Sequence, residues 1–395
     1  MGDVTELKSA SRVHKGEWTD SGVPFFRSSD VMAAINGTTN EKAYISEELY
    51  EKLSNASGKL EEGDVLVTGG GSVGNPYIVP NNEPLYTKDA DLLWIKNQGR
   101  FYPYFLYEYF FSPTFRIYLS NISHVGTIAH YTITQLSETP ISLPDIEEQI
   151  KVGEYFESLD RLITLHQRKC EQTKNLKKYM LQKMFPQNGA KVPEIRFNGF
   201  THDWEQRKLG DLVDRVTRKN QDLVSELPLT ISAQYGLIDQ NEFFDKRVAS
   251  KDVSGYYLIE NGEFAYNKST STDAPWGAIK RLDRYENGVL STLYIVFGIK
   301  ENNPVDSDFL VSYYSTNLWH KGIHEIAAEG ARNHGLLNIA PADFFQTRLM
   351  IPQDIEEQKK IGKYFIELEA LITLHQRQCD ELKKMKKYML QNMFI

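Results

Sequence analysis

Apolar side chains recur every three or four residues in two long stretches of the chain, 145–185 and 354–394. This spacing puts them on one stripe of an α-helix and is typical of the seam between paired helices. A helix of 41 residues would be roughly 60 Å long. The predicted seam positions are Phe156, Leu159, Ile163, His166, Cys170, Thr173, Met180 and Met184, and then Phe365, Leu368, Ile372, His375, Cys379, Leu382, Met389 and Met393.

The two stretches are copies of one another. They are identical at 27 of 41 aligned positions, at an offset of 354 − 145 = 209 residues. Just after a proline, each copy has two acids three residues apart, Asp145 with Glu148 and Asp354 with Glu357. This pattern predicts a helix N-cap with a reciprocal acid. The chain therefore consists of two half-molecules, each a variable region followed by a shared helix.

Charge is polarised along the shared helix. Residues 145–160 hold six acids and one lysine, whereas residues 168–183 hold six basic residues and one glutamate. This complements the helix dipole, and it predicts antiparallel pairing of the two copies because acidic halves then face basic halves. Such pairing would place the variable regions at opposite ends of a rigid spacer. A phosphate-binding strip is the alternative interpretation of the basic halves.

The variable regions share only a skeleton, which indicates similar folds with different loops. The aromatic block Phe101–Phe111 has the spacing of a core helix rather than of a base-stacking platform. The matched pieces are Gly63–Val67 with Gly262–Tyr266, Phe105–Phe115 with Phe309–Trp319, and Gly126 and His130 with Gly330 and His334.

Composition adds limits to these expectations. With 45 basic and 53 acidic residues the net charge is −8, so the chain as a whole is not one that coats nucleic acid through counterion release. Any nucleic-acid role must depend on local surfaces. Two cysteines, no export signal and no apolar stretch long enough to span a bilayer predict a cytoplasmic protein without membrane association.

Two pairs of potential metal ligands recur in the helices. His166 and Cys170 lie four residues apart, and His375 and Cys379 repeat the spacing, which is formally a zinc set if the helices pair at that level. The alternative is that these side chains fill the seam between leucines and methionines. We favour the seam, and we expect no metal.

Catalytic motifs are weak. Gly69–Gly74 follows a strand-like segment, but prolines follow where a phosphate-binding turn would open a helix. Asp273–Trp276 has only a faint likeness to the motif with which amino-methyltransferases hold a flipped adenine. We expect no catalysis by this chain, and an enzyme using Gly69–Gly74 for a nucleotide is kept as a rival hypothesis.

Side chains that could contact DNA are more frequent in the loops than catalytic motifs are. Arg and Lys bind guanine or phosphate, Asn binds adenine, and Ser and Thr bind either base. The cluster Gly330–His334 is the strongest candidate because Arg, Asn and His crowd a glycine-flanked turn. The candidate DNA-binding residues are Arg12, Lys15, Arg27, Ser72, Asn75, His130, Asn267, Lys268, Ser269, Thr270, Lys280, Arg281, Arg332, Asn333 and His334.

The whole pattern resembles the specificity (S) subunit of type I restriction-modification systems. Two variable regions alternate with two helices marked DIEEQ and ITLHQR. The other segments that carry the resemblance are GDVLVTGGGSVG at 63–74, EGARNHGLLNI at 329–339 and PEIRFNGFTHDWEQRKLG at 193–210.

The resemblance implies an α/β protein with two target recognition domains joined by two long antiparallel coiled-coil helices, an internal two-fold repeat. Each recognition domain would read one half of a bipartite site in double-stranded DNA. The helices would set the spacer and dock two methyltransferase subunits. The expected divisions are a first recognition domain at 1–142, a helix at 143–186, a linker at 187–208, a second recognition domain at 209–350 and a helix at 351–395.

The resemblance also implies that the chain has no active site or cofactor of its own, as a subunit of a DNA adenine methyltransferase and endonuclease complex. S-adenosylmethionine, ATP and Mg are expected on partner subunits, which include the restriction and translocase subunits. One departure stands out, because Pro193–Leu209 precede Gly210 but have no counterpart before Gly2. A rival hypothesis is an interaction protein with a coiled-coil scaffold and no specific DNA binding.

Overall fold

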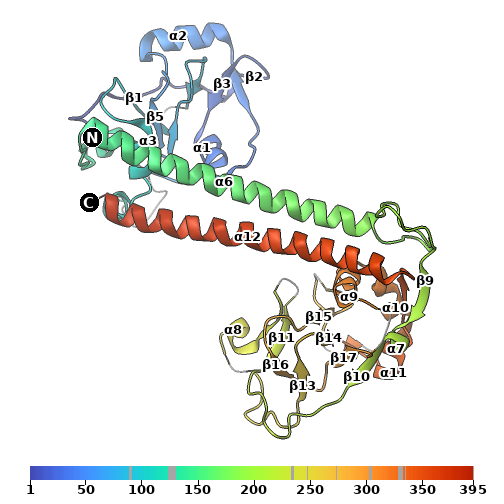
Figure 1. The fold of residues 1–395 in the computed structure, drawn as a ribbon. Helices are drawn as coiled ribbons and strands as arrows, with labels where there is room; N and C mark the ends of the chain where they lie inside the picture. The colour runs from blue at the N-terminus through green and yellow to red at the C-terminus, as the bar shows by residue number, and fades with distance from the viewer. Residues whose placement is uncertain are drawn as a thin grey trace. The chain divides into compact units, whose positions relative to one another are not determined.

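The computed structural model forms two compact units. Unit 1 comprises residues 1–168 and 375–395, and unit 2 comprises residues 169–374. Two long helices, α6 (Ile146–Lys183) and α12 (Ile355–Met393), each begin in one unit and end in the other (Figure 1). The residues described are 1–88, 91–122, 130–232, 235–246, 248–272, 274–301, 305–327, 332–333 and 335–394.

Unit 1 contains two sheets of four strands. The first is antiparallel in the order β1-β8-β5-β6, and its strands β5 and β8 are buried along their whole length. The second has the order β2-β4-β3-β7. The strands are β1 (Leu7–Ser9), β2 (Trp18–Thr19), β3 (Val23–Phe26), β4 (Ala43–Ile45), β5 (Val65–Thr68), β6 (Pro76–Ile78), β7 (Tyr86–Thr87) and β8 (Leu92–Ile95).

The aromatic block of the first half is a core helix, as predicted. It forms α3, whose Phe105, Leu106 and Tyr109 are buried in the core that includes the first sheet and the two long helices. The short helices of unit 1 are α1 (Ser28–Asn36), α2 (Glu47–Ser57), α3 (Pro103–Tyr109), α4 (Pro113–Ile122) and α5 (Ile133–Glu138), with a 3₁₀ turn η1 (Lys15–Glu17).

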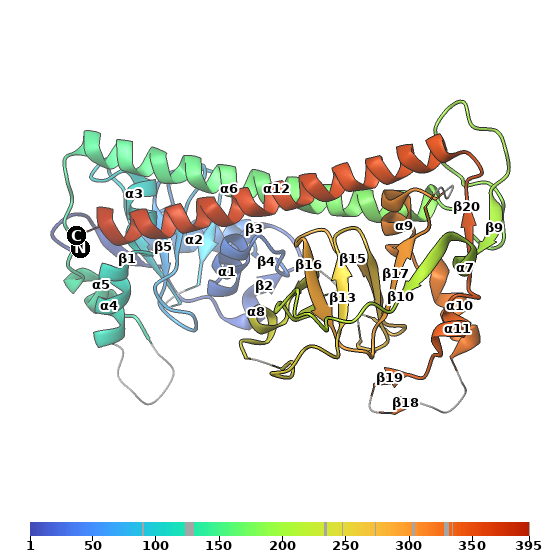
Figure 2. The same ribbon diagram turned by 60° about the horizontal axis from the view of Figure 1, so that its bottom comes forward.

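Unit 2 repeats this plan. Its four-stranded sheet has the order β10-β17-β14-β15, which is the chain-order equivalent of β1-β8-β5-β6 (Figures 1 and 2). Helices α9, α10 and α11 then follow as α3, α4 and α5 do, so the weak skeleton match predicted a shared fold correctly. These elements are β10 (Val213–Val216), β14 (Phe264–Asn267), β15 (Ala278–Arg281), β17 (Ile295–Ile299), α9 (Ser307–Tyr314), α10 (Leu318–Ile326) and α11 (Pro341–Phe344).

Four strand pairs complete unit 2, namely β11 with β12, β13 with β16, β18 with β19, and β9 with β20. The bounds are β9 (Glu205–Lys208), α7 (Leu209–Leu212), β11 (Leu229–Ser232), β12 (Gly236–Asp239), α8 (Gln240–Phe244), β13 (Tyr257–Glu260), β16 (Asn287–Leu290), β18 (Arg332–Asn333), β19 (Leu336–Leu337) and β20 (Arg348–Ile351).

The long helices pair antiparallel within each unit. In unit 1 the Tyr155 hydroxyl lies 3.5 Å from Met385 Sδ, and His166 Nδ1 lies 3.1 Å from His375 Nδ1. Residue numbers therefore increase along α6 in the direction in which they decrease along α12. In unit 2 Lys177 forms an ion pair with Glu369. The predicted seam is confirmed at its most apolar positions, because Phe156, Leu159, Ile163, Phe365 and Leu368 are buried.

One predicted helix cap is found and one predicted partner is wrong. Asp145 Oδ1 accepts a hydrogen bond from the Glu148 amide at 2.8 Å, which makes Asp145 the N-cap of α6. Glu357, expected to cap α12 reciprocally, is instead fully buried and accepts two hydrogen bonds from the Arg196 guanidinium at 2.6 and 2.7 Å. The segment 187–208, expected as a linker, thus packs against α12 in unit 2.

The four potential zinc ligands do not converge. Cys170 lies one turn after His166, and Cys379 lies one turn after His375. Because the helices are antiparallel, the two cysteines lie on opposite sides of the contact between the histidines. Among the described residues no group of three or more His, Cys, Asp or Glu side chains could hold a metal ion. The seam interpretation of these side chains accounts for their positions. No described helix is both long and apolar enough to cross a membrane.

Candidate nucleic-acid interface

The glycine-rich segment of unit 1 forms a loop between the antiparallel strands β5 and β6, not a phosphate-binding turn before a helix. Thr68 fastens its base, since the Oγ1 donates to the Ser72 carbonyl at 2.5 Å and accepts from the Asn75 amide at 2.9 Å. Asn75 Nδ2 donates to the same Ser72 carbonyl at 2.8 Å. The side chain of Ser72 is exposed at the tip. The result is a short, rigid loop that presents backbone and small polar groups.

A second segment of unit 1 lies against this loop. The amide of Tyr131 donates to the Gly69 carbonyl at 2.8 Å, and the neighbouring His130 is exposed. Arg116 on α4 donates to Asn75 Oδ1 at 3.1 Å. Three of the predicted residues, Ser72, Asn75 and His130, therefore lie in one region. Sequence reasoning missed Thr68 and Arg116, which carry no motif and act by holding the loop in place.

The corresponding loop of unit 2 follows β14. Asn267 Oδ1 accepts from the Ser269 amide at 3.0 Å, so Asn267 shapes the turn. Lys268 Nζ donates to the Ile339 carbonyl at 3.4 Å, and burial lowers the pKa of this lysine. Ser269 is exposed at the tip. Of the four candidates Asn267 to Thr270, Asn267 and Lys268 therefore shape the loop, and Ser269 is exposed at its tip.

The cluster judged strongest from the sequence joins this loop. Arg332 and Asn333 form β18, which pairs with β19, and Leu336 bridges to Ser269. The amide and the hydroxyl of Thr270 donate to the Gly335 carbonyl at 2.7 and 2.9 Å. His334, Gly330 and Gly126 lie outside the described residues. The strand at 332–333 is therefore connected through β19 to the loop that follows β14.

Both units build this region in the same way. In unit 1 the amide of Tyr131 binds the carbonyl of Gly69, and in unit 2 the amide of Leu337 binds the carbonyl of Lys268 at 3.0 Å. In unit 1 the loop after β5 is hydrogen-bonded to the segment after α4. In unit 2 the loop after β14 is hydrogen-bonded to the segment after α10. The framework is shared, whereas the side chains on the two loops differ. Different side chains on one framework are what two readers of different sequences require.

Three predicted residues near the start of the chain lie elsewhere in unit 1. Arg12 and Lys15 are exposed, beside Val13 in the apolar cluster that packs around β3 and β4. Arg27 precedes α1 and forms an ion pair with Asp30 at 2.9 Å, with its guanidinium 5.7 Å from the Trp18 ring. Its side chain is only 18% exposed. Arg27 is therefore engaged in fixing the start of α1.

Two predicted residues on β15 are also engaged by the fold. The guanidinium of Arg281 pairs with Asp283 at 2.6 Å and with Asp308 at 2.8 Å, and its side chain is 13% exposed. Lys280 is half-buried, and burial lowers its pKa, helped by the nearby charge of Lys177. Arg281 is thus engaged by carboxylates, and both residues lie on β15 rather than in the loop at 267–270.

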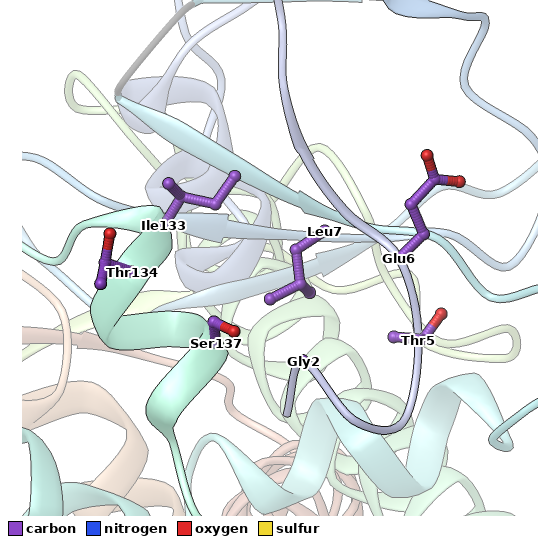
Figure 3. Close-up of a pocket in the computed structure, with 7 residues that line it drawn as sticks. All are labelled: Gly2, Thr5, Glu6, Leu7, Ile133, Thr134 and Ser137. Carbon is purple, nitrogen blue, oxygen red and sulfur yellow. The ribbon is translucent and has the colours of Figure 1, made fainter.

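An open pocket of about 420 Å³ lies between the first residues of unit 1 and α5 (Figure 3). Figure 3 shows Ser137 on α5 directed toward the segment that carries Gly2 and Leu7. Ser137 stands at the position that Phe345 takes in unit 2, at an offset of 208 residues. The lining holds one charged residue, Glu6, and no pair of groups suited to nucleophilic or acid–base catalysis.

Comparison with known proteins agrees with this geometry. The family described as type I restriction modification DNA specificity domain matches residues 1–175. A putative type I restriction enzyme specificity subunit of Haemophilus influenzae is 28% identical over 171 residues, which are 42% of this chain and 41% of that protein. The chain thus aligns with about two fifths of this relative's length.

One solved structure extends the likeness in fold to the whole chain. The S subunit of a type I system from M. genitalium superposes with a TM-score of 0.58 at 14% identity, over 100% of this chain and 94% of that one. The HsdS subunit from Thermoanaerobacter tengcongensis gives a TM-score of 0.46 at 17% identity, over 98% and 94% of the two chains.

The fold is that of a type I specificity subunit: two α/β units and two long helices. Residues 1–175 match the model of the type I restriction modification DNA specificity domain family, and the resemblance seen in the sequence is confirmed.

Proposed function

We propose that this chain is the sequence-specificity subunit of a type I restriction-modification complex, with each unit reading one half of a bipartite DNA site. The observation that carries the proposal is the loop framework built twice, after β5 and after β14, with different polar side chains on each copy. A protein that reads two different half-sites needs one framework and two sets of contacts. Among their described residues neither loop brings a catalytic group with it, which suits a subunit that recognises DNA while partner subunits act on it.

The long helices supply a surface for such partners. Each unit exposes two leucines from the middle of one long helix. It also exposes a tyrosine with a leucine or methionine from the basic half of the other. All eight side chains are between 37% and 63% exposed, and the two sets are related by the 209-residue offset. In unit 1 they are Leu162, Leu165, Met385 and Tyr388, and in unit 2 they are Leu371, Leu374, Leu176 and Tyr179.

A repeated apolar surface is expected to bind the same partner twice. We propose two methyltransferase subunits as its occupants, with S-adenosylmethionine bound to them rather than to this chain. Restriction and translocase subunits, which use ATP and Mg, would join the same assembly. The proposal predicts that charged substitutions in one set remove one of the two methyltransferase subunits.

Adenine-methylation sequencing of cells with and without the gene tests the function directly. We expect one bipartite motif to lose methylation on deletion and to regain it when the gene is restored. A methylome that stays the same in both comparisons, with the chain expressed, would contradict the proposal. Binding of the assembled complex to the recovered motif should weaken steeply as salt rises, since phosphate contacts release counterions.

A further inference from the structure

The loop between β14 and β15 in unit 2 is longer than its counterpart between β5 and β6 in unit 1. The register of the strands aligns the two loops, and each loop ends at a glycine with positive φ, Gly74 in unit 1 and Gly277 in unit 2. The loop of unit 1 has six residues, 69–74, whereas the loop of unit 2 has ten, 268–277.

The longer loop contains a turn that its own backbone closes. The amide of Ser271 donates to the Ala274 carbonyl at 3.1 Å, and the amide of Ala274 donates to the Ser271 carbonyl at 3.2 Å. The Gly277 amide also donates to the Ala274 carbonyl, at 3.1 Å. The side chains of Ser271 and Thr272 are exposed. The additional residues therefore have a defined backbone conformation.

Trp276 occupies the position of Val73, directly before the glycine. The carbonyl of this position is fixed in both units, although by different groups. The Val73 carbonyl accepts from the Arg116 guanidinium at 3.4 Å, and the Trp276 carbonyl accepts from the Tyr266 hydroxyl at 2.9 Å. Both side chains pack against the core of their unit and stay partly exposed. The base of the longer loop thus holds an indole where unit 1 has a small aliphatic group.

His324 on α10 lies against this indole. The two ring centroids are 5.1 Å apart and the ring planes are 78° apart, which is the edge-to-face arrangement that aromatic pairs favour. The counterpart of His324 on α4 is Ser120, at the same offset of 204 residues that relates Phe115 to Trp319. His324 and Ser120 are both exposed. The position beside the loop therefore carries an imidazole in unit 2 and a hydroxyl in unit 1.

A second histidine of α10 faces the core instead. His320 is the counterpart of Arg116, and its ring lies 4.5 Å from the Trp319 ring. Burial lowers the pKa of His320. His324, one turn later on α10, is the histidine that contacts the loop and remains open to solvent.

His324 lies between two elements to which DNA recognition was assigned above. Through Trp276 it contacts the loop that follows β14. It also precedes Arg332, the first residue of β18, by eight positions. The hairpin of β18 and β19 is bridged to the same loop by Leu336 and Ser269. A DNA duplex held by the loop and the hairpin would pass close to the exposed face of α10 at His324.

We propose that His324 contacts DNA in the half-site read by unit 2 and that Trp276 positions its ring. The inference rests on the proposed function, because it requires the loop after β14 to face DNA. An imidazole donates a hydrogen bond to a phosphate oxygen or to an acceptor on a base edge. The edge contact with Trp276 restricts the imidazole and so lowers the entropy cost of that hydrogen bond. Val73 and Ser120 supply neither part, so the contact belongs to one half-site.

The test measures binding of the assembled complex to duplexes that carry the methylated motif, with each base pair of both half-sites replaced in turn. His324→Ala should weaken binding to the parent motif about tenfold. Reduced discrimination at one base pair of one half-site identifies a base edge as the acceptor, and an equal loss on every duplex identifies a phosphate. Ser120→Ala is the matched change in unit 1 and should leave binding unchanged. Thermal unfolding of both variants should match that of the parent, because both side chains are exposed.

The role of Trp276 is tested through its coupling to His324. Trp276→Leu should weaken binding by about the same factor as His324→Ala, and Trp276→Phe should retain most of the affinity because a phenyl ring keeps the edge contact. Once His324 is alanine, Trp276→Leu should have little further effect. An equal effect of Trp276→Leu in both backgrounds would overturn the positioning role.

The outcomes separate this inference from the proposed function. Binding of His324→Ala that equals binding of the parent on every duplex would overturn the inference and leave the proposed function in place. A parent complex that binds every duplex equally would overturn both.

Discussion

His166 and His375 are equivalent residues of the two helical repeats, 209 positions apart, and their Nδ1 atoms lie 3.1 Å from each other. Contact between equivalent residues is what antiparallel pairing of two copies produces at the centre of the pair. Both rings are half-buried in an otherwise apolar seam. One ring nitrogen must donate and the other accept, so the pair is complementary only when at least one ring is neutral.

We expect this histidine pair to behave as a unit in stability measurements. Either single variant, His166→Leu or His375→Leu, leaves the other ring nitrogen facing an apolar group and should lower the free energy of unfolding by about 1 kcal/mol. The double variant should recover at least that loss, because apolar side chains suit the seam. Urea unfolding of the four proteins gives the coupling energy. Strictly additive losses would contradict a direct interaction.

The core of unit 1 holds a buried carboxylate that should make its stability depend on pH. Burial raises the pKa of Glu108 to about 7, against the lowering effect of Lys386 and with a smaller raising effect of Asp160. Lys386 Nζ lies 2.8 Å from Glu108 Oε1 and 2.7 Å from both Asp160 oxygens, and the Tyr104 hydroxyl donates to Asp160. Tyr107 is the remaining titratable neighbour of this cluster.

The sign of this pH dependence follows from proton uptake. Between about pH 4.5 and pH 7 the folded chain keeps a proton on Glu108 that the unfolded chain has released. Raising the pH through this window should therefore reduce the free energy of unfolding, by up to about 3 kcal/mol. Glu108→Gln should flatten the profile and be more stable than the parent at pH 8. A parallel profile in the variant would show that Glu108 is not the group responsible.

The repeat provides a matched control for the same cluster. Lys177 and Glu369 are the counterparts of Lys386 and Asp160, and their side chains are 23% and 49% exposed. Lys386→Met leaves the buried Glu108 and the partly exposed Asp160 without a cation and should cost about 3 kcal/mol of unfolding free energy. Lys177→Met breaks a more exposed pair, so its cost should stay below about 1 kcal/mol. Thermal unfolding at pH 7 compares the two, and equal losses would contradict the role of burial.

The two loops should act as independent readers. Because Arg332 and Asn333 belong to the hairpin beside the loop of unit 2, alanine at both positions should alter recognition of one half-site. Loss of one base-specific contact costs about 1 to 3 kcal/mol in discrimination. Ser72→Ala with His130→Ala is the matched change in unit 1 and should alter the other half-site. Methylome sequencing of cells that carry each double variant shows which half-site is altered. Equal loss at both half-sites from either double variant would contradict modular reading.

The framework could be predicted from the sequence, whereas the partners of individual side chains could not, for physical reasons. The helices are visible because their seam repeats over 41 residues, and the antiparallel order follows from their charge. Arg27 and Arg281 stay predictions as DNA contacts, but the sequence did not show that both pair with carboxylates close in sequence or space. Composition cannot show which partner an arginine finds. The ion pair of Glu108 could not be predicted from the sequence either, because its partner Lys386 lies 278 positions further along the chain.

The helices should also act as a ruler for the spacer between half-sites. Each helix begins in one unit and ends in the other, so seven residues added to both, next to His166 and next to His375, would extend each by about 10 Å while keeping the seam in register. At 3.4 Å per base pair this corresponds to about three additional base pairs. We expect methylation to move to a motif with the same half-sites and a longer spacer. The same insertion in α6 alone puts Lys177 out of register with Glu369 and should reduce methylation without defining a new spacer. Full methylation at the original spacer in the double insertion would contradict the ruler.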